Sequence, residues 1–236
     1  MMPLSRATTA RRVAGLVAVA GLTLSACGGS AVKATSTPTA STTSTPTTAT
    51  PSPSSTPYTG RTQVVKVKKY GISFALPKGW ITLDAKKILT KDNPGIKALA
   101  KRMGTTPDQL NRTLAAGMEV YAVTDKGAVA GYLDNVNVTG QRGTDLNDDQ
   151  IKLQFAALGA KLGTFRHTTS AAGDVTRVSF TLPIAGRQAY GVSVVVFTED
   201  STVNITAGAH SASIAGELAD MIEGSLRTIP GNGPDL

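Results

Sequence analysis

Hydrophobic and polar residues alternate at the start of the region that we expect to fold. Val65 and Val67 alternate with lysines, and the apolar positions of the next run, 72–76, share one face. A period of two residues predicts β-strands. We therefore expect a hairpin that ends at Pro77 and Gly79.

Helical spacing of apolar residues follows this hairpin. It occurs at 85–89 and again at 96–103. Thr106 then supplies an N-cap, and Pro107 suits the first position of a helix. These signals predict a short third helix that ends at Gly117.

The second half of the chain predicts a long antiparallel meander. Strands are expected at 118–124, 133–139, 165–170, 174–182, 188–198 and 201–207. Asn147 and Gly163 bound an intervening helix, and a closing helix is expected at 213–228. Tyr190–Phe197 is apolar on both faces, as in a central strand that is covered on two sides. The order predicts an α+β sandwich, a mainly antiparallel sheet with packed helices.

The first 26 residues predict a bacterial secretion signal. Arginines precede an apolar run from Val13 to Leu24, which is too short for a permanent membrane helix. The segment Leu24-Ser25-Ala26-Cys27 resembles the lipobox of bacterial lipoproteins, which implies cleavage before Cys27 and its acylation by a lipid with chains such as palmitate. We expect the product to be exported and anchored to the outer face of the cytoplasmic membrane. General secretory and twin-arginine export both stay open.

Residues 27–60 form the expected tether between this lipid and the folded part. From Thr35 to Pro57, 21 of 23 residues are Ser, Thr or Pro. Such a segment has no apolar surface to bury, so we expect it to be disordered, and its composition also suits O-glycosylation. Residues 61–230 predict a single globular domain, and 231–236 predict a flexible tail.

One dense motif accompanies this organisation. Residues 72–80 read Ile-Ser-Phe-Ala-Leu-Pro-Lys-Gly-Trp, and Ser225 and Leu226 lie near the end of the closing helix. Together with the lipobox, the tether and the meander, they make the chain resemble the LpqN and LpqT type of actinobacterial lipoprotein. The resemblance implies a PsbP-like α/β/α sandwich and a role in cell-envelope maintenance, by binding envelope lipids or glycolipids or by assisting their transporters. It implies no catalytic residue.

The net charge of +8 is spread unevenly. Residues 61–112 hold 12 basic and 3 acidic residues, whereas 113–236 hold 8 and 13. One interpretation is a solvated face whose lysines protect an edge strand from aggregation. The other is a face that docks anionic lipid headgroups or an acidic membrane-protein partner, and nucleic acid is not expected outside the membrane. The residues concerned are Lys66, Lys68, Lys69, Lys86, Lys87, Lys91, Lys97, Lys101 and Arg102.

Few residues suit catalysis. Cys27 is the only cysteine, which excludes a disulfide framework within the chain and a cysteine metal cluster. His167 and His210 are the only histidines. An envelope hydrolase that uses one of them is the rival hypothesis, and two structural histidines are the simpler one.

Two further motifs indicate structure rather than chemistry. One motif matches the first three ligand positions of a calcium-binding loop, at Asp145, Asn147 and Asp149. The glycine and the final glutamate of such a loop are missing, so the N-terminus of a helix explains these residues better. Three N-glycosylation patterns are incidental in a bacterial protein and begin at Asn111, Asn137 and Asn204. We expect no metal, no cofactor and no catalytic residue.

Aromatic residues are the candidates for binding. An apolar pocket between sheet and helices is one interpretation of them, and ordinary core packing is the other. The candidates are Trp80, Tyr121, Tyr132, Tyr190 and Phe197. The leading hypothesis is a non-enzymatic envelope lipoprotein that binds a lipid, a glycolipid or a membrane-protein partner, and the other alternative is an adaptor that docks through its lysine-rich face.

Overall fold

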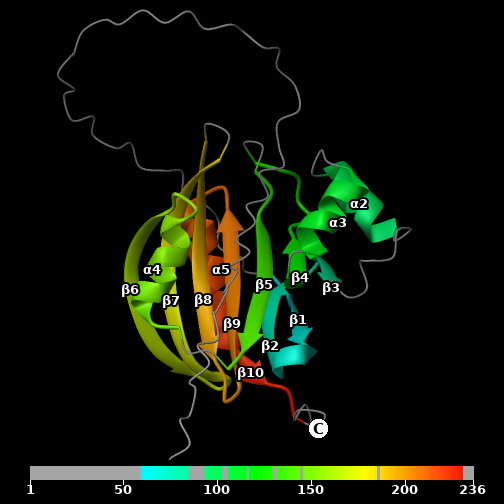
Figure 1. Ribbon diagram of the computed structural model, residues 1–236. Coiled ribbons are helices and arrows are strands. Elements are labelled where there is room, and N and C mark those ends of the chain that lie inside the picture. The colour runs from blue at the N-terminus through cyan, green and yellow to red at the C-terminus, as the bar shows by residue number, and fades with distance from the viewer. Residues whose placement is uncertain are drawn as a thin grey trace, which may run out of the picture.

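The computed structural model covers most of the expected domain. It describes residues 60–84, 94–102, 106–115, 117–129, 132–143, 146–184 and 187–230 (Figure 1). The secretion signal with Cys27, nearly all of the tether, the helix expected at 85–89 and the tail at 231–236 lie outside these residues. None of the helices described in these ranges has the length and apolar character needed to cross a membrane.

A sheet of seven strands forms the centre of the domain (Figure 1). In spatial order its strands are β3 (Ile81–Asp84), β4 (Met118–Val123), β5 (Asn135–Arg142), β9 (Ser201–Ala209), β8 (Arg187–Phe197), β7 (Gly173–Ile184) and β6 (Lys161–Ser170). Every pair of neighbours is antiparallel. The predicted meander and the α+β class are confirmed.

A second sheet of three strands lies beside β3 and β4. It consists of β1 (Thr62–Val67), β2 (Ile72–Pro77) and β10 (Arg227–Thr228) in the order β1-β2-β10. The β1–β2 connection is a 3-10 turn, η1 (Lys68–Tyr70), which ends at Gly71 with φ of 62°. The Tyr70 ring lies on Gly140 of the large sheet, where an added Cβ would come within 2.5 Å of the ring. Glycine is therefore required at position 140 for this approach.

The described residues form four helices: α2 (Pro94–Arg102), α3 (Pro107–Ala115), α4 (Asp148–Ala156) and α5 (Ala212–Ser225). The predicted caps of α3 and α4 are confirmed, and a further cap begins α5. Thr106 accepts a hydrogen bond from the Gln109 amide, and Asn147 forms a complete capping box with Gln150. Ser211 caps α5 by accepting from the amide of Ile214. These caps satisfy amides that the first turn leaves without helical partners.

One face of the large sheet packs on α5, and we call it the α5 face. Val192, Val194 and Val196 of β8 belong to the same buried cluster as Leu218 and Ile222 of α5. The β1–β2 hairpin extends this cluster, and the Ser225 hydroxyl of α5 accepts from the amide of Ala75 in β2 at 2.8 Å. The α5 face therefore forms the main hydrophobic core, in which apolar burial provides the dominant stabilisation.

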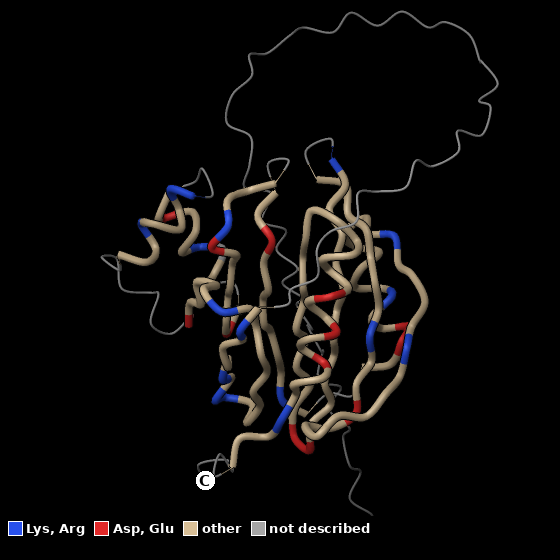
Figure 2. Tube along the Cα trace, turned by 180° about the vertical axis from the view of Figure 1, so that it is seen from behind, with Lys and Arg blue, Asp and Glu red and all other residues tan. Residues whose placement is uncertain are grey.

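Ion pairs hold α5 to the edge of the α5 face. Glu223 accepts hydrogen bonds from Arg166 at 2.7 Å and from Thr168 at 2.8 Å, both on β6. Arg177 of β7 pairs with Glu223 at 3.2 Å and also with Asp220. Figure 2 shows these acidic positions along α5, between strands that carry Lys and Arg. The closing helix is thus fixed by both packing and charge.

The opposite face of the sheet, which we call the α4 face, carries two smaller apolar clusters. Under α2 and α3, a cluster includes Leu83, Tyr121 and Leu110. Under α4, a second cluster includes Phe155 and Phe180, whose ring centroids lie 4.8 Å apart. Figure 1 shows these helices over the two flanks of the sheet, with α5 behind it.

The structure corrects the sequence predictions in three places. The closing helix expected at 213–228 ends at Ser225, because Arg227–Thr228 pair with β2 as strand β10. The helix predicted to run from Asn147 to Gly163 ends at Ala156, because Gly159 takes a left-handed conformation with φ of 70° and the chain re-enters the sheet as β6. Leu162, assigned to the helix, pairs with Phe180 of β7 instead. The four-residue strand β3 was not predicted, since it directly follows the Pro77 turn and is short.

Candidate functional site

The centre of the α4 face is polar. Three adjacent strands, β5, β9 and β8, place hydroxyl and amide side chains in register there. In one row Asn137 pairs with Thr206, which pairs with Ser193. The next two rows contain Thr139 with Asn204 and Gln141 with Thr202. We call this set the polar strip: Asn137, Thr139, Gln141, Ser193, Thr202, Asn204 and Thr206.

The polar strip lies between the two apolar flanks of the same face. On one side, Tyr121 of β4 pairs with Asn137 and belongs to the cluster under α2 and α3. On the other side, Val178 of β7 pairs with Ser193 and belongs to the cluster under α4. Polar side chains are unusual at the centre of a sheet that has helices on both faces. No labelled helix lies over β5 and β9 on this side in Figure 1.

The side chains of the polar strip keep unused hydrogen-bonding groups. Ser193 and Thr206 both donate to the side-chain oxygen of Asn204, at 2.7 and 3.2 Å. The Asn204 amide nitrogen and the side chains of Asn137 and Gln141 make no hydrogen bond within the described chain, although all three residues are half-buried. Half-buried amides with open donors and acceptors are suited to a polar ligand, because leaving them unpaired costs free energy.

Three of the five candidate aromatic residues border the polar strip. Tyr121 and Phe197 lie on the α4 face in register with Asn137 and Thr202. The Tyr132 hydroxyl accepts from the Asn135 amide at 3.2 Å. An added Cβ at position 208 would come within 2.7 Å of the same hydroxyl, so the phenol lies directly against the sheet.

Burial shifts the pKa of both bordering tyrosines upward. It raises the pKa of Tyr121 well above its ordinary value and raises that of Tyr132 despite the hydrogen bond from Asn135. Trp80 and Tyr190 pack instead with the main core on the α5 face. The five aromatic residues therefore do not converge on one pocket, and their role in ligand binding stays a prediction.

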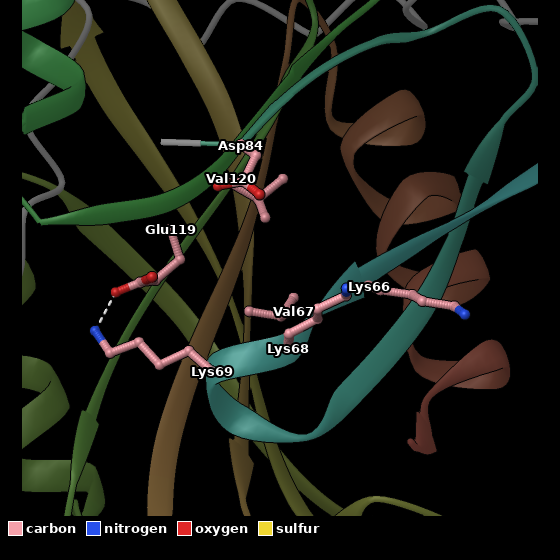
Figure 3. A pocket seen from close by; sticks show the side chains of 7 residues that line it. All are labelled: Lys66, Val67, Lys68, Lys69, Asp84, Glu119 and Val120. Carbon is pink, nitrogen blue, oxygen red and sulfur yellow. Dashed lines mark hydrogen bonds and ion pairs between the residues drawn. The ribbon is translucent and has the colours of Figure 1, made fainter. Parts of the chain in front are cut away.

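Part of the lysine-rich face surrounds a cavity of about 340 Å³ on the other side of the sheet (Figure 3). Its lining is Lys66, Val67, Lys68, Lys69, Asp84, Glu119 and Val120. Lys69 extends to Glu119 and forms an ion pair with it. Burial lowers the pKa of Lys69, but the hydrogen bond to Glu119 and the neighbouring Tyr70 outweigh this and raise it overall.

The other basic residues of the lysine-rich face do not line this cavity. Lys97, Lys101 and Arg102 are exposed on α2, which packs on the α4 face, and Arg102 donates to the carbonyl of Asp125 at 2.6 Å. Three others, Lys86, Lys87 and Lys91, lie outside the described residues. The lysine-rich face thus divides over two sides of the domain.

Both histidines contact aspartates. His210 Nδ1 lies 2.8 Å from Oδ1 of the buried Asp134, which also accepts from the His210 amide. His167 Nδ1 lies 3.0 Å from the Thr176 hydroxyl, and its Nε2 lies 3.3 Å from Asp148. A Ser-His-Asp arrangement also needs a hydroxyl at the second ring nitrogen. No described hydroxyl or thiol hydrogen-bonds to His210 Nε2.

The copied calcium positions belong to a helix start. Asn147 caps α4, with Asp148 and Asp149 in its first turn, and Asp145 lies outside the described residues. Within the described ranges, no group of three or more His, Cys, Asp or Glu side chains is placed to hold a metal ion.

Comparison with known proteins gives structural likeness only. No protein-family model matches the chain, and no curated protein matches it. The structure is similar to the solution structure of cyanobacterial PsbP (CyanoP) from Synechocystis sp. PCC 6803, with a TM-score of 0.42 and 12% identity over 75% of this chain and 98% of that one.

A second similar structure is LpqN of Mycobacterium tuberculosis, described as involved in cell envelope biogenesis. The TM-score is 0.43 and the identity 10%, over 67% of this chain and 83% of that one. The resemblance found in the sequence had named both the PsbP-like fold and the LpqN type. At these values we draw no conclusion about residues, ligands or organism from either structure.

Proposed function

We propose that this chain is an exported, lipid-anchored and non-enzymatic protein of the cell envelope whose polar strip binds the neutral sugar headgroup of a glycolipid. The observation that supports this most is the in-register set of hydroxyl and amide groups at the centre of the α4 face. It is a fixed array on rigid strands rather than on loops, so little ordering is needed when a ligand binds.

The chemistry of the strip favours a sugar over a charged headgroup. Sugars present hydroxyl groups that both donate and accept hydrogen bonds, and the strip offers hydroxyls and amides of the same dual character. None of its seven members is ionisable. Tyr121, Tyr132 and Phe197 at its borders add aromatic surface for the apolar face of a sugar ring or for the start of an acyl chain.

The sequence motifs support the location. The lipobox that ends at Cys27 and the following Ser/Thr/Pro segment are expected to hold the domain beside a membrane that contains such lipids. The proposal thus brings a membrane anchor and a headgroup site into one chain. It requires no metal and no cofactor.

Lipid analysis of the purified protein is the first test. The chain is purified from membranes in octaethylene glycol monododecyl ether, a detergent without a sugar, and organic extracts are examined by mass spectrometry. We expect a sugar-bearing lipid in near-stoichiometric amount besides the acyl groups on Cys27. A protein that carries only phospholipid contradicts the proposal.

Headgroup binding is then measured with defined probes. Saturation-transfer NMR compares maltose, a neutral disaccharide, with glycerol phosphate, an anionic headgroup. The double variant Thr206→Val, Asn137→Leu should lose the maltose signal, because it removes a hydroxyl and an amide from one row of the strip. The matched control Thr181→Val removes a hydroxyl from a half-buried residue that lies opposite Tyr190 in the β7–β8 ladder, on the α5 face, and should keep the signal.

A hydrolase remains the second candidate because one observation favours it. The contact between His210 Nδ1 and buried Asp134 resembles two members of a catalytic triad. If the domain were an envelope esterase or glycosidase of this kind, His210→Ala would abolish turnover while the fold stayed intact. We expect no turnover in the unmodified protein and hence no such difference.

A further inference from the structure

The two sheets leave an open seam between β1 and β3. Within the described residues, β1 pairs only with β2, and β3 pairs only with β4. Each therefore presents one edge that is not part of a ladder. Unpaired strand edges display rows of N–H and C=O groups that another extended chain can pair with.

The hydrogen bonds of β2 fix the direction of the unpaired groups on β1. The Ala75 amide donates to Ser225 at 2.8 Å and so points away from β1. Val64 is opposite Ala75, and Lys66 is two residues further along. Because hydrogen-bonded and non-hydrogen-bonded pairs alternate in an antiparallel ladder, the backbone groups of Val64 and Lys66 point out of the small sheet.

Side chains, not backbone, connect the two edges. The Gln63 amide of β1 reaches the Trp80 carbonyl at 2.7 Å and the Thr82 hydroxyl at 3.4 Å. Paired strands lie about 4.8 Å apart. Because a glutamine side chain, and not the backbone, bridges β1 to the start of β3, these two strands are farther apart than paired strands. The ion pair of Lys69 with Glu119 joins η1 to β4 beyond the other end of β1.

The cavity of about 340 Å³ adjoins the Lys69–Glu119 ion pair, and its lining comes from β1, η1, β3 and β4. Figure 3 shows Lys69 turned to Glu119, with the Lys66 side chain extending the opposite way, away from Glu119. Three lysines outnumber the two carboxylates in the lining, and Val67 and Val120 add apolar surface. Val64, the neighbouring outward residue on β1, is 67% exposed.

We propose that the seam between β1 and β3 accepts an extended acidic segment of a partner protein, which adds to β1 as an edge strand. The backbone groups of Val64 and Lys66 supply the ladder, and the ammonium group of Lys66 favours an acidic residue opposite it on the partner strand. This surface lies on the opposite side of the sheet from the polar strip, so the inference is independent of sugar binding.

A synthetic strand tests this directly. The probe is the peptide acetyl-Glu-Val-Glu-Val-Glu-amide, added to the full chain in octaethylene glycol monododecyl ether, and amide hydrogen exchange is followed by NMR. We expect the Val64 and Lys66 amides to become protected. The same peptide N-methylated at every residue cannot donate to the ladder in any register and should bind at least roughly tenfold more weakly.

Two variants separate backbone pairing from charge. Val64→Pro removes the outward N–H without touching the bonds to β2 and should abolish protection, whereas Val64→Thr should keep it. Lys66→Glu should weaken binding roughly five- to tenfold, whereas the matched Lys78→Glu, at the far end of the β1–β2 hairpin, should leave it unchanged.

Other occupants give different results and would overturn the inference. Equal binding of the N-methylated peptide, or competition by glycerol phosphate, would assign the cavity to an anionic headgroup. Protection of Val64 without peptide, together with dimers in sedimentation, would assign it to a second copy of the chain. Equal binding of a peptide with Lys in place of Glu would remove the charge selection.

Discussion

The two faces of the large sheet differ in what covers them and in how they are built. The α5 face is a continuous apolar surface under one helix, and ion pairs to Glu223 hold that helix at the sheet edge. The α4 face is apolar only under its helices, and Asn204 at its centre accepts from two hydroxyls. The first face explains why the domain folds, and the second holds the site that we propose for the ligand.

The largest expected effect is on the α5 face. Leu218→Ala removes a side chain that is fully buried between α5 and the sheet, and it should lower the free energy of unfolding by about 2–5 kcal/mol. Leu153→Ala on α4, where the side chain is 71% exposed, should change it by less than about 0.5 kcal/mol. Urea denaturation measures both, and equal losses would contradict the assignment of the main core.

The flank of the α4 face should be packed almost as tightly. Gly191→Ala places a Cβ within 2.2 Å of the Phe180 ring, and Phe155 lies against that ring, so we expect a loss of about 1–3 kcal/mol. Gly216→Ala in α5 meets no atom within 4 Å and should be neutral or stabilising by up to about 1 kcal/mol. A neutral Gly191→Ala would show that this flank is loosely packed.

The charges at the edge of the α5 face predict a pH dependence. Burial raises the pKa of Glu223, but hydrogen bonds from Thr168, Arg166 and Arg177 outweigh it and hold the pKa below its ordinary value. The stabilisation is therefore complete above the ordinary pKa and is lost as the pH falls through the folded-state value.

The variant Glu223→Gln isolates this contribution. Urea midpoints measured from about pH 6 to about pH 3 should fall more steeply for the unmodified protein than for the variant. A variant with the same acid dependence would show that other carboxylates determine it.

The smallest expected change in stability is at the polar strip. Thr206→Val keeps the shape of a buried side chain and removes one hydrogen bond to Asn204, so it should cost no more than about 1.5 kcal/mol. The same variant should weaken maltose binding. A change in binding with little change in stability would separate the functional face from the structural one.

Much of this architecture could be predicted from periodicity and caps. The alternation in β1 and β2, the doubly apolar β8 and the caps at Thr106 and Asn147 all agree with the structure. The end of α4 was misplaced because Leu158 and Leu162 continue its helical spacing, although Gly159 turns the chain back to the sheet. Spacing alone does not show which apolar residue has left the helix.

The polar strip was the harder part to predict. Its signal was present as polar residues at alternate positions, in Asn137-Val138-Thr139 and in Asn204-Ile205-Thr206. Those triplets were interpreted as incidental glycosylation patterns. That they form one surface depends on the register of β5 with β9, which pairs Asn137 with Thr206. Register between strands more than 60 positions apart is a tertiary property.

The most direct test of the account follows the side-chain amides of the strip during a maltose titration. In a two-dimensional NMR spectrum of the full chain, the NH₂ signals of Asn137, Gln141 and Asn204 should shift together and saturate, while the backbone signals of Lys66–Lys69 stay in place. Unchanged strip amides, or shifts confined to the lysine-lined cavity, would contradict the claim that the α4 face binds a sugar headgroup.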